Sequence, residues 1–298
     1  MTEQNTLEQQ TQDAEPGEVR PSRIRRFLVS TARLIFFAYA TVLVMLVVME
    51  SRLVYPGAYM EIPGADFAGA TTVNYQSGDG TKLTGRLFER SGAKHSMIFF
   101  HGNGVTAARE SRTIANLSHT FNANVMAAEY RGFDSLEGTP NETGLIEDSL
   151  AARDFMCERY GVKPDQLVLY GQSLGGGCAV AVASDSGAKL LVLDRTFDKM
   201  VDVAQAMYWF VPVKFLMRNR FDSVARIQNY QGPLVQLHGN ADRLIPIEHG
   251  KRLHDSAPSK VKHWIVADGM GHNDATPTKA WNEFSMRIQD LLSANANH

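Results

Sequence analysis

Residues Leu167 to Val180 read Leu-Val-Leu-Tyr-Gly-Gln-Ser-Leu-Gly-Gly-Gly-Cys-Ala-Val. An apolar run with β propensity meets a Gly-x-Ser-x-Gly pattern, and small residues of a helical segment follow from Cys178 to Ala183. This order predicts a strand, a sharp turn and a helix, with Ser173 on the turn. Glycines two residues before and after the serine let the strand and the helix come close together. We therefore expect the hydroxyl of Ser173 to be exposed above a sheet.

The context of the Gly-x-Ser-x-Gly pattern matters, because the same pattern also occurs in ordinary glycine-rich turns. A phosphate-binding loop fits poorly, since Gly175-Gly176-Gly177 is followed by Cys178-Ala179 and not by Lys-Ser or Lys-Thr. The first amides of the helix after the serine lack partners inside the helix and point to where an oxyanion would form. The stretch therefore favours a nucleophilic serine.

Apolar runs that resemble the strand before Ser173 recur along the chain, and helical segments separate them. The runs are Met97–Phe100, Val125–Ala128, Leu190–Leu193, Leu234–Leu237 and Trp264–Val266. Before them, Thr72–Tyr75 and Leu83–Phe88 are expected to form an antiparallel hairpin across Asp79-Gly80. Alternation of strands and helices predicts an α/β fold with a mostly parallel sheet of about eight strands flanked by helices. Ligands of such sheets bind beyond the carboxyl ends of the strands.

A serine hydroxyl is a weak nucleophile, so it needs a base, and the base needs a carboxylate to orient it. His272 is the predicted base because it follows the last strand, in a loop between Gly271 and Asn273. The other candidates, His119, His249 and His254, fall on predicted helices, where we expect surface positions.

The predicted acid is Asp242, which follows the strand Leu234–Leu237. Asp194, at the end of the preceding strand, is the alternative. With Asp242, the chain order of the three groups is serine, aspartate, histidine, which differs from the order in other triad folds. The two amides of the oxyanion hole are assigned to Leu174, directly after the serine, and to Asn103, in the loop after the strand Met97–Phe100.

The N-terminal part of the chain has two segments of different composition. Residues 1–26 are rich in polar groups, end in a cluster of arginines and are predicted to be a disordered basic tail. Residues 27–49 are predicted to be one transmembrane helix, with Arg33 reaching the interface. A buried core helix and a cleaved signal peptide, cut near Ala38-Tyr39-Ala40, are the alternatives. Because that site lies in the middle of the apolar run, an uncleaved anchor is favoured.

The orientation of the predicted anchor follows from its arginines, which lie almost all on the N-terminal side. We expect a cytoplasmic N-terminus and a catalytic domain in the periplasm or outside the cell. Residues 50–70 are predicted to be a connector, and residues 71–298 the catalytic domain, with a small cap at about 196–231. In this cap, Tyr208, Trp209 and Phe210 are candidate substrate-binding residues, and plain packing on the sheet is the alternative.

The composition argues against several classes of function. The chain has 298 residues with a formal net charge of −2, so no broad electrostatic attraction to nucleic acid is expected. Its two cysteines, Cys157 and Cys178, lie in predicted helices and form no metal or redox motif. We therefore expect no metal and no organic cofactor.

Five motifs carry a resemblance to a known family. They are His101-Gly102-Asn103-Gly104, Tyr130-Arg131-Gly132-Phe133, Gly171-Gln172-Ser173-Leu174-Gly175-Gly176, His238-Gly239-Asn240-Ala241-Asp242-Arg243-Leu244-Ile245-Pro246 and Gly271-His272. From about Thr71 to its end, the chain resembles the α/β-hydrolase superfamily. Its single apolar N-terminal segment and Arg52-Leu53-Val54-Tyr55-Pro56 resemble the membrane-tethered serine-aminopeptidase-like and ABHD-type hydrolases. One departure is Asp134, where family members often carry glycine.

The resemblance implies a serine hydrolase that cleaves esters, thioesters, lipids or occasionally peptides, without a cofactor. We therefore expect a membrane-anchored enzyme that cleaves an acyl ester or thioester of a lipid or small molecule through an acyl-enzyme intermediate. A serine peptidase of the same fold is the first alternative. The second is an inactive hydrolase fold that serves as a membrane-tethered binding module, which the presence of Ser173, Asp242 and His272 argues against.

Overall fold

The structure, a computed structural model, describes residues 22–60 and 69–294. It divides into two compact units, Met1–Leu46 and Val47–His298. Most of the predicted disordered tail, residues 1–21, lies outside the described residues, as do residues 61–68 of the predicted connector.

The first unit contains most of helix α1, Arg23–Val48, which is long and apolar. At 1.5 Å per residue a helix of 26 residues is about 39 Å long, more than the roughly 30 Å of a bilayer core. Among the described residues it is the one helix that is long and apolar enough to cross a membrane. Its position near the N-terminus fits either a signal sequence or an anchor.

The second unit is built around an eight-stranded sheet in the order β1-β2-β4-β3-β5-β6-β7-β8. The strands are β1 Ala70–Gln76, β2 Lys82–Phe88, β3 His95–Phe100, β4 Ala123–Ala128, β5 Val168–Gln172, β6 Leu190–Asp194, β7 Leu234–Gly239 and β8 Lys262–Ala267. β1 and β2 pair antiparallel with each other, β2 pairs antiparallel with β4, and all remaining pairs are parallel. The prediction of a mostly parallel α/β sheet is therefore confirmed.

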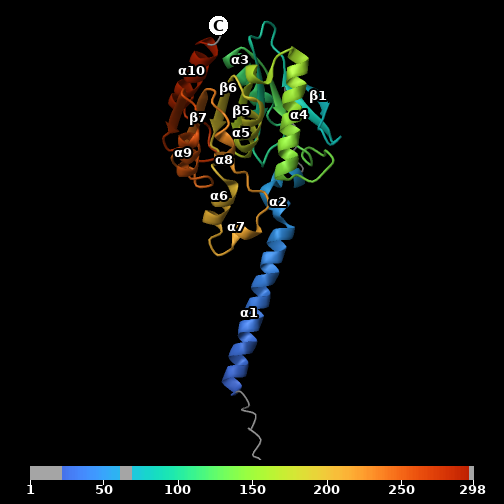
Figure 1. Cartoon of the computed structure of the whole chain (residues 1–298), viewed down its shortest axis with the longest axis vertical. Helices are drawn as coiled ribbons and strands as arrows, with labels where there is room; N and C mark the ends of the chain where they lie inside the picture. Colours follow the sequence, from blue (N-terminus) through green and yellow to red (C-terminus); the bar gives the residue numbers. More distant parts are fainter. Residues whose placement is uncertain (1–21, 61–68, 295–298) are drawn as a thin grey trace, which may run out of the picture. The chain divides into compact units, whose positions relative to one another are not determined.

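Helices cover both faces of this sheet (Figure 1). The remaining helices are α2 Glu50–Val54, η1 Pro56–Tyr59, α3 Ser111–Phe121, α4 Glu142–Tyr160, η2 Pro164–Gln166, α5 Leu174–Ser186, α6 Met200–Met207, α7 Val213–Leu216, α8 Ser223–Ile227, α9 Ile247–Ser256 and α10 Thr278–Ala294. One apolar core contains side chains from α3 and α10, and the other contains side chains from α4, α5, α8 and α9. Because both faces are covered, β6 and β7 are buried along their whole length, as continuous apolar strands require.

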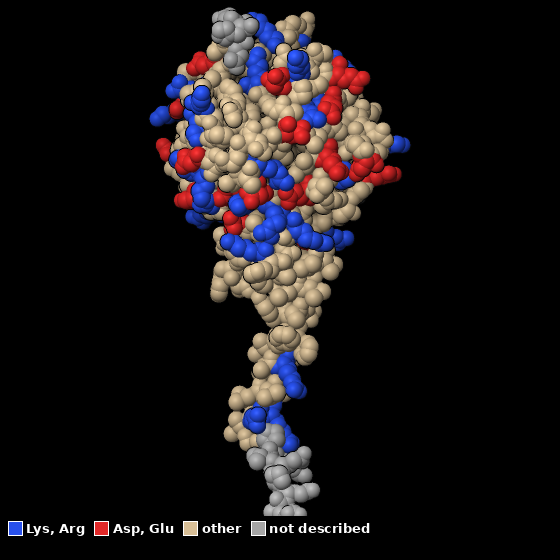
Figure 2. Space-filling view, viewed as in Figure 1, with Lys and Arg blue, Asp and Glu red and all other residues tan. Residues whose placement is uncertain are grey.

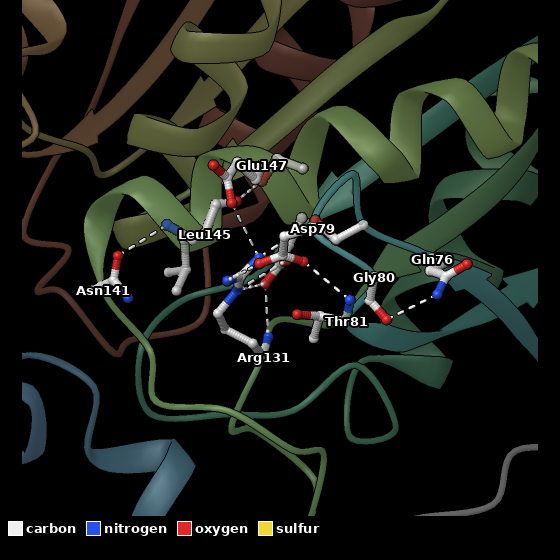
Figure 3. A network of polar contacts seen from close by, with 12 residues as sticks. Gln76, Asp79, Gly80, Thr81, Arg131, Asn141, Leu145 and Glu147 are labelled. Carbon is white, nitrogen blue, oxygen red and sulfur yellow. Dashed lines mark hydrogen bonds and ion pairs between the residues drawn. The ribbon is translucent and has the colours of Figure 1, made fainter.

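A charged network fixes the β1–β2 turn to helix α4 (Figure 3). Arg131 donates from Nε and Nη2 to the fully buried carboxylate of Asp148, and from Nη1 to Asp79 on the turn, at 2.8 Å. The loop that carries Arg131 continues through Asp134 and Ser135, which have positive φ angles of 47° and 63°. Left-handed backbone costs a non-glycine residue energy, and Asp134 and Ser135 both adopt it.

Helices α6, α7 and α8 lie between β6 and β7 in the chain, in the region predicted to be a small cap. An antiparallel bridge between Lys199 and Asp222 and an ion pair between the same side chains join the two ends of this region. On the face of the second unit drawn in Figure 2, basic and acidic side chains are interspersed over most of the surface, and a row of basic side chains crosses its lower part.

Candidate active site

Ser173 lies between β5 and α5, where the chain turns sharply from strand to helix. Its backbone has φ 53° and ψ −119°, a strained conformation for a residue with a side chain. Ser173 N donates to Asp194 O at 3.0 Å, and Thr196 Oγ1 donates to Ser173 O at 2.8 Å. These bonds to the segment after β6 stabilise the strained turn.

The glycines around Ser173 leave no space for a side chain. A Cβ atom on Gly171 would lie 2.5 Å from Gly175 O, and one on Gly175 would lie 2.0 Å from Phe100 O. At Gly176 it would lie 2.1 Å from Thr196 Oγ1. These contacts allow α5 to begin directly against β3 and β5, which is the close approach that the sequence pattern predicts.

The structure brings Ser173, His272 and Asp242 together in a chain of hydrogen bonds. Ser173 Oγ lies 2.9 Å from His272 Nε2, and His272 Nδ1 lies 2.7 Å from Asp242 Oδ2. The carboxylate requires Nδ1 to carry a proton, so neutral His272 presents an unprotonated Nε2 to the serine hydroxyl. This is the arrangement in which an imidazole can remove the proton of a hydroxyl group.

Hydrogen bonds fix Asp242 in its ionised form. Its Oδ1 accepts from the backbone N–H groups of Leu244 and Ile245 at 2.9 and 2.8 Å. Burial alone would raise the pKa of Asp242, but bonds from His238, His272 and Ile245 outweigh burial and lower this pKa well below its usual value. The negative charge beside His272 therefore persists across the neutral and mildly acidic range.

Asp194, the alternative acid, pairs with a different residue. It forms two hydrogen bonds of 2.8 and 2.9 Å with Arg195, and both side chains are buried. Arg195 in turn donates from Nη1 to the backbone oxygens of His272 and Asp274. Arg195 thus fixes the loop that carries His272. Sequence reasoning missed this role, because the positive φ of 48° that turns Arg195 toward the loop is not visible in the residue pattern.

The loop after β3 passes beside the serine. A Cβ atom on Gly102 would lie 3.5 Å from Ser173 Cβ, so the loop and the nucleophile are in contact. The side chain and the backbone carbonyl of Asn103 both form hydrogen bonds: Nδ2 donates to Val54 O, and the carbonyl O accepts from Gly57 N. Leu174 is the first residue of α5, where a backbone N–H has no acceptor within the helix. Of the two residues predicted to form the oxyanion hole, Leu174 directly follows Ser173 in the chain, and Asn103 directly follows Gly102, the residue beside Ser173.

His101 is fully buried behind this loop and lies between two hydrogen-bond acceptors. Its Nε2 lies 2.8 Å from Glu129 Oε1 and its Nδ1 lies 2.8 Å from Gly102 O. Both neighbours are acceptors, so both ring nitrogens must donate. Burial alone would lower the pKa of His101, but the charge and hydrogen bond of Glu129 and the Gly102 carbonyl raise it above its usual value.

This pair predicts a pH dependence of stability. Because the pKa of His101 is raised on folding, its contribution is complete below the unfolded pKa of about 6.5 and is lost as pH rises through the folded pKa. We expect the free energy of unfolding to fall by up to about 1.4 kcal/mol per pH unit in that range. Denaturant unfolding of the full chain and of His101→Gln between pH 5.5 and 9 measures it. Equal slopes for both proteins would contradict the assignment.

Two histidines differ from the expectation of surface positions, because His249 and His254 are both buried. His249 Nδ1 lies 2.6 Å from Asp198 Oδ1, and His254 packs against the ring of Trp264. Helix α9, which carries them, packs against α8 of the cap region and against β8, neighbours that the helical pattern alone does not reveal.

The aromatic residues of the cap region are exposed. Trp209 is 81% exposed, and its ring packs edge to face on Phe210, while Tyr208 is also exposed. Within residues 22–60 and 69–294, no group of three or more His, Cys, Asp or Glu side chains is arranged to hold a metal ion.

Comparisons with known proteins support the fold and place the chain in a family. The chain is 31% identical over 249 residues to the uncharacterized protein YfhR of Escherichia coli O157:H7. This match covers 80% of this chain and 85% of YfhR. It is 28% identical over 228 residues to the uncharacterized protein Rv2307c of Mycobacterium tuberculosis, covering 76% and 81% of the two chains. No protein-family model matches the chain.

Among solved structures, the esterase Pf2001 of Pyrococcus furiosus superposes with a TM-score of 0.65. The match covers 79% of this chain and 96% of the esterase at 19% sequence identity, which shows a shared fold. The identity to YfhR over most of both chains shows more than a shared fold. This chain therefore belongs to the YfhR family, and its second unit has the α/β-hydrolase fold.

Proposed function

We propose that this protein is a membrane-anchored serine hydrolase that cleaves an acyl ester or thioester through an acyl-enzyme intermediate. The observation that carries the proposal is the hydrogen-bonded chain from Ser173 through His272 to Asp242. The strained turn at Ser173 and the ionised state of Asp242 add support, because both are features of an activated serine.

The proposed reaction has two halves. In the first, Ser173 Oγ attacks the acyl carbonyl carbon while His272 Nε2 takes the hydroxyl proton, and the amides of Asn103 and Leu174 donate to the oxyanion. The bond to the leaving group then breaks, and His272 gives its proton to the departing alcohol or thiol. In the second half, water attacks the acyl-enzyme, His272 takes the proton of the water, and the released serine recovers it.

The lipid-like character of the acyl group is the finer part of the proposal. Tyr208, Trp209 and Phe210 are its proposed contacts, supported by their exposure on the cap region. If they bind the acyl chain, replacing Trp209 and Phe210 by serine shifts the preference from long to short acyl chains. An unchanged chain-length preference excludes the role.

Two measurements on the full chain test the activity. A fluorophosphonate probe should label the protein, with the adduct found by mass spectrometry on the peptide that contains Ser173. A panel of p-nitrophenyl esters, acyl thioesters and aminoacyl amides should then show cleavage of the esters or thioesters. Cleavage of the amides alone would identify a peptidase. A protein that is not labelled and cleaves none of the substrates would be an inactive fold used for binding.

The proposed location is the membrane, with the N-terminus in the cytoplasm and the catalytic domain on the periplasmic or outer side. Support comes from the length and composition of α1 and from Arg23, Arg25, Arg26 and Arg33 in its first half. Protease added to spheroplasts should digest the catalytic domain. A domain that is protected until the cells are lysed would reverse the orientation, and a mature protein that lacks residues 1–40 would identify a cleaved signal.

A further inference from the structure

The segment Glu50–Tyr59, which we call the strap, comprises α2 and η1 and follows α1 in the chain. The strap belongs to the second unit and is fixed to it at its first residue. Glu50 is 6% exposed, and its Oε1 accepts from Arg218 N, Asn219 N and Asn219 Nδ2, each at 2.8 Å. Its Oε2 accepts from Arg218 Nε at 2.9 Å. A buried carboxylate with four donors is a strong attachment.

The middle of the strap is attached as well. Tyr55 is fully buried in the apolar core, and its hydroxyl donates to Asn219 Oδ1 at 2.8 Å. The same oxygen accepts from the backbone N–H of Glu142 at the start of α4, at 2.7 Å. The strap is therefore held between the end of the cap region and α4, and its backbone has a defined position.

The next contacts of the strap are with the loop beside Ser173. Asn103 Nδ2 donates to Val54 O at 2.9 Å, and Gly57 N donates to Asn103 O at 2.9 Å. These two bonds use both the side chain and the carbonyl of Asn103, so the strap sets the position of this whole residue. Neither bond uses the backbone N–H of Asn103, the group assigned to the oxyanion hole.

Gly57 makes this contact possible because it has no side chain. A Cβ atom at residue 57 would lie 2.8 Å from Asn103 O and 2.9 Å from Phe133 Cε1. Asn103 O is a backbone atom of the loop after β3, so it can move away from residue 57 only if that loop moves.

We propose that the strap is a positioning element of the oxyanion hole, which it fixes through Asn103. This inference rests on the proposed function, since it assigns a role in the same site. The segment that joins α1 to the sheet is then part of the active site, and neither Val54 nor Gly57 needs to touch the substrate. A change at Gly57 acts on the transition state, because the oxyanion exists only there.

Gly57→Ala in the full chain tests the proposal. The added methyl group should displace the backbone N–H of Asn103 from the oxyanion hole. This should lower kcat for an ester by about tenfold to a hundredfold and change KM by less than about threefold. An aryl boronic acid forms a bond from Ser173 Oγ to boron and places an oxygen in the oxyanion hole, so its affinity should fall by the same factor as kcat. Gly78→Ala is the matched control, because a Cβ atom there meets nothing within 4 Å.

A second variant separates positioning from folding. Asn103→Leu removes the donor to Val54 O, keeps a similar volume and leaves the backbone N–H in place. In a double-mutant cycle, the two changes should be clearly less than additive in kcat, because both break the same contact. If Gly57→Ala does not fold, Asn103→Leu alone must show the loss of kcat and of boronic acid affinity.

Three results have distinct meanings. Wild-type protein that neither labels with fluorophosphonate nor turns over any substrate refutes the proposed function itself. An active wild type with folded variants whose kcat stays within about twofold of wild type overturns the role of the strap. A rise in KM at unchanged kcat also overturns it, because the strap would then act on substrate binding and not on the oxyanion.

Discussion

Replacing Ser173 by alanine should lower kcat for ester hydrolysis by about 10⁵-fold or more and abolish fluorophosphonate labelling. The size follows from the loss of the nucleophile, which in serine hydrolases costs about as much as removal of the whole catalytic triad. Residual hydrolysis would come from the oxyanion hole and substrate binding alone. Initial rates with a p-nitrophenyl ester and in-gel fluorescence of the labelled protein are the two measurements.

Ser91→Ala is the control for this experiment, because Ser91 is an exposed serine in a turn between β2 and β3. It should keep both labelling and rate. Circular dichroism should show that Ser173→Ala folds, since alanine keeps the Cβ atom and the bonds that hold the turn use the backbone N–H and C=O of residue 173 and not the hydroxyl. Labelling that persists in Ser173→Ala would place the nucleophile elsewhere in the chain.

The exchange of Asp242 for asparagine should reduce kcat by about 10⁴-fold. An amide in place of the carboxylate can donate to His272 Nδ1, which favours the tautomer with the proton on Nε2, and that tautomer cannot accept the proton of Ser173. The negative charge that stabilises the protonated imidazole is lost at the same time. The measurement is kcat at pH 8 on variant protein whose unfolding midpoint has been determined.

Asp194→Asn is the matched comparison. Asp194 is the last residue of β6 and Asp242 lies in the loop after the neighbouring strand β7, and the two aspartates differ in their partners. The variant leaves the bond between His272 and Asp242 intact and weakens only the ion pair with Arg195. Its kcat should fall by no more than about tenfold, the factor that corresponds to roughly one hydrogen bond. The opposite ranking of the two variants would show that Asp194 is the acid.

Much of the fold could be predicted because its signals are local. Continuous apolar runs predict strands that are buried on both faces, and β3, β6 and β7 are such strands. Asp79-Gly80 predicts the hairpin between β1 and β2. The glycines around Ser173 predict a turn in which strand and helix are in contact, because no other residue fits there.

The sequence did not predict in the same way which partner each polar side chain contacts. Asp194 and Asp242 look alike in sequence, since both follow an apolar strand. Their side chains differ in partner because Arg195 adopts a left-handed backbone and turns its guanidinium toward Asp194 and the His272 loop. Likewise, His249 is buried beside Asp198, which lies 51 residues away in the sequence.

The sequence by itself determined the order of strands and helices, the turn at Ser173 and the polar residues at the carboxyl ends of the strands. These features depend on glycine, apolar periodicity and β propensity, which act over a few neighbouring residues. Only the tertiary structure decided that Asp242 and not Asp194 contacts His272, and that residues 50–59 lie against Asn103. These pairings join groups 30 to 49 residues apart, so they depend on how whole elements pack and not on any local pattern.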